Sequence, residues 1–178
     1  MSLATIKRII VLLLIASSGA LGLQSSNETK EQSVFQEEKQ FDHPIPIPQT
    51  ALSVLRHDKQ VTFCFQKYPE LKEIPAPWFE AAEISLARGS STGLIVKDKN
   101  PCLGAADAGR FWVFRRVGQR FELVLSDSGN SLEILDSYRN GYRDIIVNSA
   151  TAAQFYTDKF KFINGKYRLT KQSVQRAK

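Results

Sequence analysis

The sequence predicts a mainly β fold with one N-terminal helix, arranged as antiparallel meanders from two tandem four-strand repeats. Short runs of β-branched and aromatic residues, separated by turn residues, fill the chain after residue 78. A helical pattern is confined to residues 50–68, and the order of strands over about 80–125 returns over about 131–169. Because 43% of the residues are hydrophobic, residues 50–170 are predicted to form a single β-rich domain with one core.

The first 22 residues have the pattern of a signal peptide. Lys7 and Arg8 precede the apolar run Ile9–Ala16, and the small residues SSGALG follow it. The apolar run is too short for a comfortable membrane span. We therefore expect a periplasmic or secreted protein that is not an integral membrane protein after cleavage. An uncleaved N-terminal anchor is the alternative.

Residues 23–49 are predicted to be a disordered, proline-containing linker, because they are polar and then alternate proline in HPIPIP. The next segment, Thr50–Tyr68, is the best helix candidate. Leu52, Leu55 and Phe63 give it a loosely amphipathic pattern, although VTFCFQ within it favours a strand. Pro69 ends any helix there.

Eight strands are expected after Trp78, with two-residue turns at Asn140-Gly141 and Asn164-Gly165, where both residue types tolerate positive φ. Residues 171–178 are expected to be a frayed tail. The predicted strands are Ala82–Leu86, Leu94–Lys97, Phe111–Arg116, Arg120–Leu125, Leu132–Leu135, Ile145–Val147, Tyr156–Ile163 and Lys166–Leu169.

The two halves of this strand series correspond at an offset of about 46–51 residues. Since a four-stranded sheet buries only one face by itself, we expect the two units to cover each other or to share the helix. The matched positions are Leu94–Val96 with Ile145–Val147, Trp112 and Phe114 with Phe160 and Phe162, and Phe121 and Leu123 with Tyr167 and Leu169.

A candidate metal site lies between the fifth and sixth predicted strands. Asp136, Asn140 and Asp144, with a glycine after Asn140, have the spacing of oxygen ligands around a Gly turn, which suits calcium. This spacing resembles the calcium loop of FG-GAP and VCBS-type propeller blades. Tyr138 stands where that pattern has Asp or Asn, and two arginines lie nearby. The alternative is a hairpin whose Asp and Asn side chains cap the turn and pair with those arginines.

Cys64 and Cys102 are the two cysteines of the chain. An oxidising compartment favours their pairing, so a Cys64–Cys102 disulfide is predicted. The alternative is two buried thiols that act as small hydrophobic residues.

The segments CLGA, FWVFRR, FELVLS, SLEI, NGYRDI and FKFINGKYRL together resemble a group of uncharacterised exported bacterial β-proteins over about Trp78–Leu169. The resemblance implies the fold and the export, and it implies no activity. The upstream loop RGSSTG lacks the carboxylates that FG-GAP loops carry.

The expected function is a non-enzymatic exported binding module for an unknown protein or a cell-envelope polymer. No common nucleophile, zinc or phosphate-loop motif occurs. The formal net charge is +6, but the arginines and lysines are scattered along the predicted domain, so nucleic-acid binding is not expected. Two alternatives are a calcium-stabilised β-domain, with no other cofactor, and a cell-envelope polysaccharide-processing enzyme. The candidate binding residues are Tyr138, Arg139, Tyr142 and Arg143.

Overall fold

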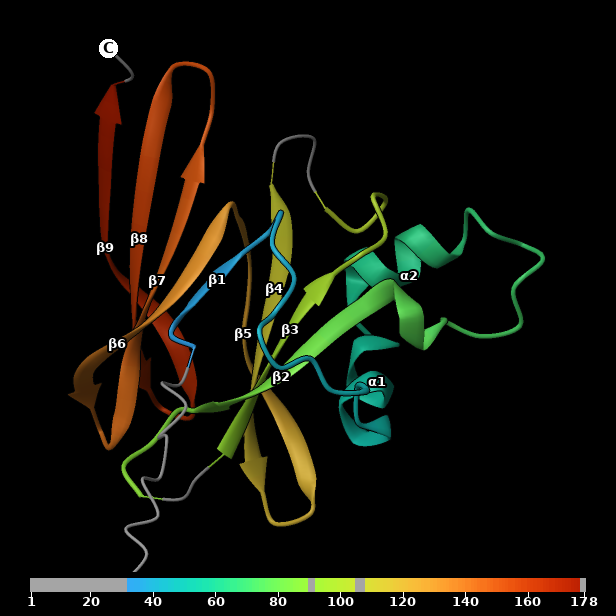
Figure 1. Cartoon of the computed structure of the whole chain (residues 1–178), viewed down its shortest axis with the longest axis horizontal. Coiled ribbons are helices and arrows are strands. Elements are labelled where there is room, and N and C mark those ends of the chain that lie inside the picture. Colours follow the sequence, from blue (N-terminus) through green and yellow to red (C-terminus); the bar gives the residue numbers. More distant parts are fainter. Residues whose placement is uncertain (1–31, 90–91, 105–107, 177–178) are drawn as a thin grey trace, which may run out of the picture. The chain divides into compact units, whose positions relative to one another are not determined.

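The computed structural model describes residues 32–89, 92–104 and 108–176. Within these residues it shows two antiparallel sheets, of five and four strands, and two short α-helices (Figure 1). The prediction of a mainly β fold is confirmed. The predicted signal peptide and the first part of the predicted linker lie outside the described residues.

The four-stranded sheet is a meander in which each strand pairs with its chain neighbours. Two of the four strands carry a fully buried run of apolar side chains, Leu94–Val96 and Phe111–Phe114, because both faces of this sheet are covered. The strands are β2 (Phe79–Ser85), β3 (Thr92–Asp98), β4 (Gly109–Val117) and β5 (Arg120–Gly129).

The five-stranded sheet is a second meander with one short strand added beside β6. Its Asn140-Gly141 and Asn164-Gly165 turns have positive φ at all four residues, which confirms the two predicted two-residue turns. The strands, in order across the sheet, are β1 (Val34–Gln36), β6 (Ser131–Arg139), β7 (Tyr142–Ala150), β8 (Gln154–Ile163) and β9 (Lys166–Arg176).

The last hairpin of each meander has the same register. In β4–β5, an unbroken series of residue pairs runs from the turn to Phe114 opposite Leu123, and a bulge at Val124 follows. In β8–β9, the same series runs from the turn to Phe160 opposite Leu169, and a bulge again follows directly. Phe114 therefore occupies the place of Phe160, two residues from the correspondence expected from sequence. The common register is what a duplicated unit would produce, and the duplication stays a prediction.

The prediction of one helix is wrong, because the described chain forms α1 (Gln49–Leu55) and α2 (Lys59–Phe65) with a break between them. Asp58 caps α2: its carboxylate accepts from the backbone N–H of Gln60 at 2.9 Å and of Val61 at 3.2 Å. The β-prone residues of α2 become helical because Val61 and Cys64 bury their side chains beside the sheet.

The described part of the predicted linker, residues 32–49, is part of the fold. Phe35 and Phe41 are buried in the core with their rings edge to face at 5.2 Å, and Ile45 makes an antiparallel bridge with Ala81. Burial of two aromatic rings offsets the entropy of ordering this polar segment. The predicted tail is also corrected, since β9 continues to Arg176, which pairs with Gln154.

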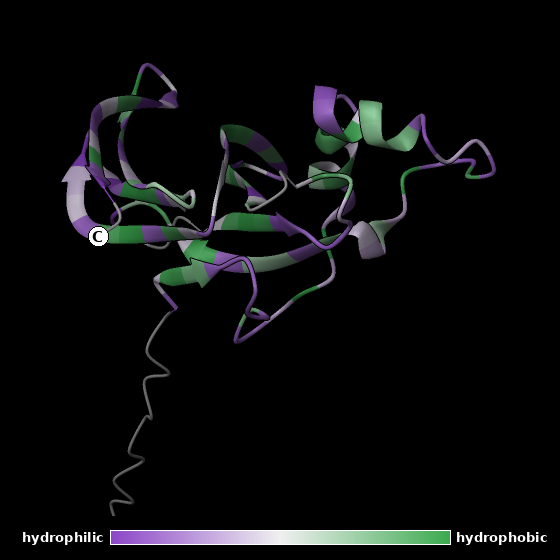
Figure 2. Cartoon of the chain, turned by 90° about the horizontal axis from the view of Figure 1, so that it is seen from above, coloured by the Kyte–Doolittle hydropathy of each residue, from purple (hydrophilic) through white to green (hydrophobic). Residues whose placement is uncertain are grey.

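The core has two layers, one on each face of the four-stranded sheet. Along β4, Phe111 and Val113 face the five-stranded sheet, whereas Trp112 and Phe114 face the helices. Figure 2 shows hydrophilic and hydrophobic residues alternating along the strands. No helix of the described chain packs on the other face of the five-stranded sheet. Nor is any helix of the described residues long and apolar enough to cross a membrane.

Candidate functional site

The segment predicted as a metal loop is a tight hairpin. Tyr138 pairs with Arg143 and Arg139 with Tyr142 on either side of the Asn-Gly turn. Further from the turn, three residues of β6 stand opposite the single residue Asp144 of β7. This bulge turns backbone carbonyl groups away from the strand ladder and leaves them in need of donors.

Arg143 supplies those donors. Its guanidinium donates to the carbonyl oxygens of Leu135 at 2.9 Å and Ile134 at 3.2 Å, and to the Asp136 carboxylate at 2.9 Å. It also donates to the carbonyl of Ser85 at 3.3 Å, at the end of β2 in the other sheet. The Arg143 side chain is 9% exposed, so this predicted binding residue joins the two sheets and offers little surface to a partner.

The three predicted metal ligands each bind a different protein group. Asp136 pairs with Arg143, as the hairpin alternative expects, and Asn140 donates to the carbonyl of Phe162 at 2.9 Å. Asp144 is buried, accepts from a serine hydroxyl at 2.8 Å and forms an ion pair with Lys159 at 3.1 Å. In the described ranges, no group of three or more His, Cys, Asp or Glu residues is placed to hold a metal ion.

The other predicted binding residues differ in exposure. Tyr138 is 39% exposed, and the Arg88 guanidinium lies 4.9 Å from its ring centre. Arg139 is exposed. Tyr142 is half-buried and stacks on Phe162 at 3.8 Å. The structure therefore leaves Tyr138 and Arg139 at the surface and places the other two in the packing between strands.

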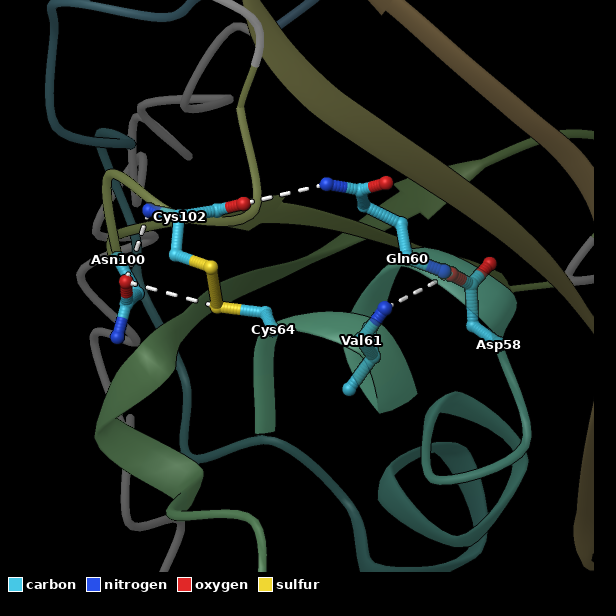
Figure 3. Close-up of a disulfide and its surroundings, with 6 residues drawn as sticks. All are labelled: Asp58, Gln60, Val61, Cys64, Asn100 and Cys102. Atoms are coloured by element: carbon cyan, nitrogen blue, oxygen red, sulfur yellow. Dashed lines mark hydrogen bonds between the residues drawn. A yellow bond between two sulfur atoms is a disulfide. The ribbon is translucent and has the colours of Figure 1, made fainter. Parts of the chain in front are cut away.

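The predicted disulfide is confirmed. Cys64 of α2 is bonded to Cys102, in the segment after β3, with a Cα–Cα distance of 5.6 Å (Figure 3). Gln60 donates to the carbonyl of Cys102 at 3.2 Å, and the Asn100 amide oxygen accepts from the Cys102 N–H at 2.9 Å. The bond therefore attaches the helical layer to the four-stranded sheet, and it occupies both thiols.

An acidic hollow of about 680 Å³ lies beside the end of β3, with Glu37, Glu80 and Asp98 among its lining residues. Burial raises the pKa of the Asp98 carboxyl, and the negative charge of Glu37 raises it further. The Arg110 N–H donates to this carboxylate at 2.6 Å and lowers the pKa, but burial has the larger effect. Lys97 is buried here and lies 3.5 Å from Glu80. Such a hollow could take a small cation or a polar group.

Lys97 is used by the fold. Its ammonium donates to the carbonyls of Gln36 at 3.3 Å and Glu37 at 3.0 Å, and to that of Lys39. Its partner Glu80 accepts from the Phe41 N–H at 2.7 Å. Together the buried pair fastens the segment after β1 to the edge of the four-stranded sheet, so neither group is free for chemistry.

A polar row on the uncovered face of the five-stranded sheet was not predicted from the sequence. Each strand contributes one half-buried residue at the same register. Asn148 donates to the Ser131 hydroxyl at 3.3 Å, and Thr157 donates to the Asn148 amide oxygen at 3.0 Å. Local alternation marks these residues as outward-facing, but only strand register aligns them. The row is Gln36, Ser131, Asn148, Thr157 and Ser173.

Comparisons with protein-family models, with curated proteins and with solved structures find no match for this chain. The resemblance to exported β-proteins and to FG-GAP blades thus stays a prediction.

Proposed function

We propose that the chain is an exported, non-enzymatic binding module for a protein or cell-envelope polymer. The observation that carries the proposal is the unequal cover of the two sheets. The four-stranded sheet is packed on both faces, whereas the five-stranded sheet keeps one face free of any described helix. A sheet face that no described helix covers and that carries aligned polar groups is a surface that a partner can cover.

The chemistry of this face supports recognition by hydrogen bonds. The polar row offers amide and hydroxyl groups that both donate and accept. Phe155, two residues before Thr157 on the same face of β8, is 52% exposed and offers an apolar contact beside the row. Tyr138 and Arg139 add an exposed aromatic ring and a cation at the β6–β7 turn.

Two side chains of the types used in nucleophilic catalysis, those of Cys64 and His57, are occupied. Cys64 is in the disulfide and supplies no thiolate to a base. His57, the histidine nearest to Cys64 in sequence, has its Nδ1 2.9 Å from the carbonyl oxygen of Ser53. These contacts favour binding over thiol chemistry.

A retention assay tests the proposal. The mature chain is immobilised, and fractionated envelope and secreted material is passed over it, with the bound mass measured. Ser173→Trp places a bulky ring in the polar row without disturbing a core position, since Trp is well tolerated in strands. Ser53→Trp, exposed on α1, is the matched control.

We expect Ser173→Trp to lose most of the saturable retention and Ser53→Trp to keep it. Equal retention by both variants would remove the uncovered face from the proposal, and no saturable retention by the native chain would remove the binding function itself.

A further inference from the structure

The β8–β9 hairpin has a net positive charge nearly as large as that of the whole chain. Residues 154–176 contain six lysines and arginines and one acid, a net charge of +5, whereas the whole chain carries +6. The sequence-based view of scattered cations is therefore wrong for this hairpin. The one acidic residue, Asp158, lies on the face of β8 that is directed to the core, together with Phe160 and Phe162.

Strand alternation places four cations on the uncovered face, next to the polar row. Lys159 stands directly opposite Lys171, and Lys161 directly opposite Arg168. We call these four residues the basic surface. Lys159 pairs with Asp144 at 3.1 Å. The other three have no acidic group within ion-pair distance among the described residues. Like charges directly opposite each other destabilise a sheet.

The hairpin fold does not require these like-charge pairs, because the other meander avoids them at the same register. There, Arg115 stands opposite Glu122 and forms an ion pair at 2.6 Å, and Val113 stands opposite Leu125. Lysines on an edge strand also discourage aggregation. That role needs cations on β9 alone and gives no reason for the lysines facing them on β8.

We propose that the basic surface binds a linear anionic glycan, a sugar polymer that carries carboxylate or phosphate groups. This inference rests on the proposed function and names its partner class. The four cations form a grid with about 7 Å between neighbours along a strand and about 5 Å across strands, which suits a chain with repeated charges. The adjoining row supplies amides and hydroxyls for sugar hydroxyl groups, and the predicted export favours an envelope glycan over nucleic acid.

The test measures the dissociation constant of the mature chain for fluorescein-labelled polygalacturonate, by anisotropy between about 50 and 200 mM salt. Labelled dextran phosphate is the second anionic arm, and neutral dextran and a single-stranded thymidine oligonucleotide are the comparison probes. The variant combines Lys161→Gln, Arg168→Gln and Lys171→Gln. The control combines Lys59→Gln, Lys72→Gln and Lys99→Gln, which removes the same charge from exposed positions elsewhere.

We expect the first triple variant to bind at least one anionic glycan about ten-fold more weakly, with a shallower salt dependence, and the control to stay within about two-fold. Because the variant relieves like-charge repulsion, its Tm should stay equal or rise by about 1–4 °C. A purely structural role for these cations would lower the Tm.

The inference would be overturned by equal weakening in both triple variants, by native binding to neutral dextran that matches the anionic arms, or by tighter binding of the oligonucleotide than of either glycan. Absence of binding to both anionic glycans would overturn it too. The envelope-retention assay would still decide the binding function separately.

Discussion

The two meanders share topology and hairpin register but differ in what surrounds them. In the four-stranded sheet, the helices cover one face and the other sheet covers the second, so β4 buries side chains on both of its faces. In the five-stranded sheet, the side chains of one face point to the core, whereas the other face carries amides, hydroxyls and lysines. Strand order alone therefore does not decide which face of a sheet is available to a partner. The neighbours of each sheet decide it.

The largest effect is expected where this contrast is sharpest. Trp112 is fully buried under the helices, lies edge to face with Phe79 at 5.7 Å, and donates to the Asp58 carboxylate at 3.1 Å. Trp112→Ala should lower the free energy of unfolding by about 4–5 kcal/mol. Phe155→Ala, on the uncovered face, should lower it by less than about 1 kcal/mol.

Urea unfolding followed by circular dichroism measures both changes. If Trp112→Ala is too unstable to purify, Trp112→Phe should still lose more stability than Phe155→Ala. Losses of equal size would mean that the face holding Trp112 and the face holding Phe155 are covered to the same extent.

The disulfide comes next, because it attaches the helical cover. It links residues 38 apart, and a loop of that length contributes about 4 kcal/mol in the chain-entropy model. The double variant Cys64→Ala/Cys102→Ala should lose about that much stability, and reductant should destabilise only the native chain. Mass measurement with and without reductant confirms the bond, and a reductant effect on the variant would contradict this explanation.

Removal of the guanidinium that joins the sheets should have a smaller effect. Arg143→Ala leaves the carbonyls of Ile134, Leu135 and Ser85 without this donor and should lower the free energy of unfolding by about 3 kcal/mol. Arg143→Lys should recover only part of the loss, because an ammonium cannot span these acceptors. The matched control is Arg139→Ala at the exposed neighbour, for which denaturation should show a change within about 0.5 kcal/mol. Similar losses at both positions would count against the joining role.

A weaker effect concerns the contact between the meanders at Asp127 of β5. Burial raises the pKa of this carboxyl, and the charge of Asp158 on β8 raises it further. The folded state therefore binds the proton more tightly than the unfolded state, so stability falls as pH rises from the ordinary value of 3.8 through the raised pKa.

Asp127→Asn should flatten this part of the stability curve and raise stability above it, while the amide oxygen keeps the acceptor for the Ser128 N–H. Denaturation at a series of acidic pH values measures the slope. A slope unchanged by the substitution would show that Asp127 is not its source.

The smallest effect is expected for calcium. Asp136 and Asp144 are already paired with Arg143 and Lys159, so excess calcium and chelator should leave the Tm of the native chain unchanged within about 1 °C. A calcium-dependent rise that Asp136→Asn abolishes would instead support the metal-stabilised alternative and would require these ion pairs to open.

Much of the β architecture could be predicted because its signals are local. Each predicted strand from Ala82–Leu86 to Lys166–Leu169 is present in the described chain. Runs of β-branched and aromatic residues between Gly and Asn turns favour strands over other local structures. The two Asn-Gly turns and the Cys64–Cys102 pair were also predicted, from residue chemistry alone. The candidate site was predicted less well. The same spacing that resembles a calcium loop folds as a bulged hairpin around Arg143.

The order of strands and turns was thus readable from neighbouring residues, whose short-range steric and hydrogen-bonding preferences act within a few positions of the chain. Contacts between distant segments settled the remainder: Phe35 and Phe41 joined the core, Asp58 divided the helix, and register aligned the polar row and the basic surface. These outcomes depend on which faces meet after the chain collapses, because burial and pairing energies belong to both partners and are not encoded at either one alone.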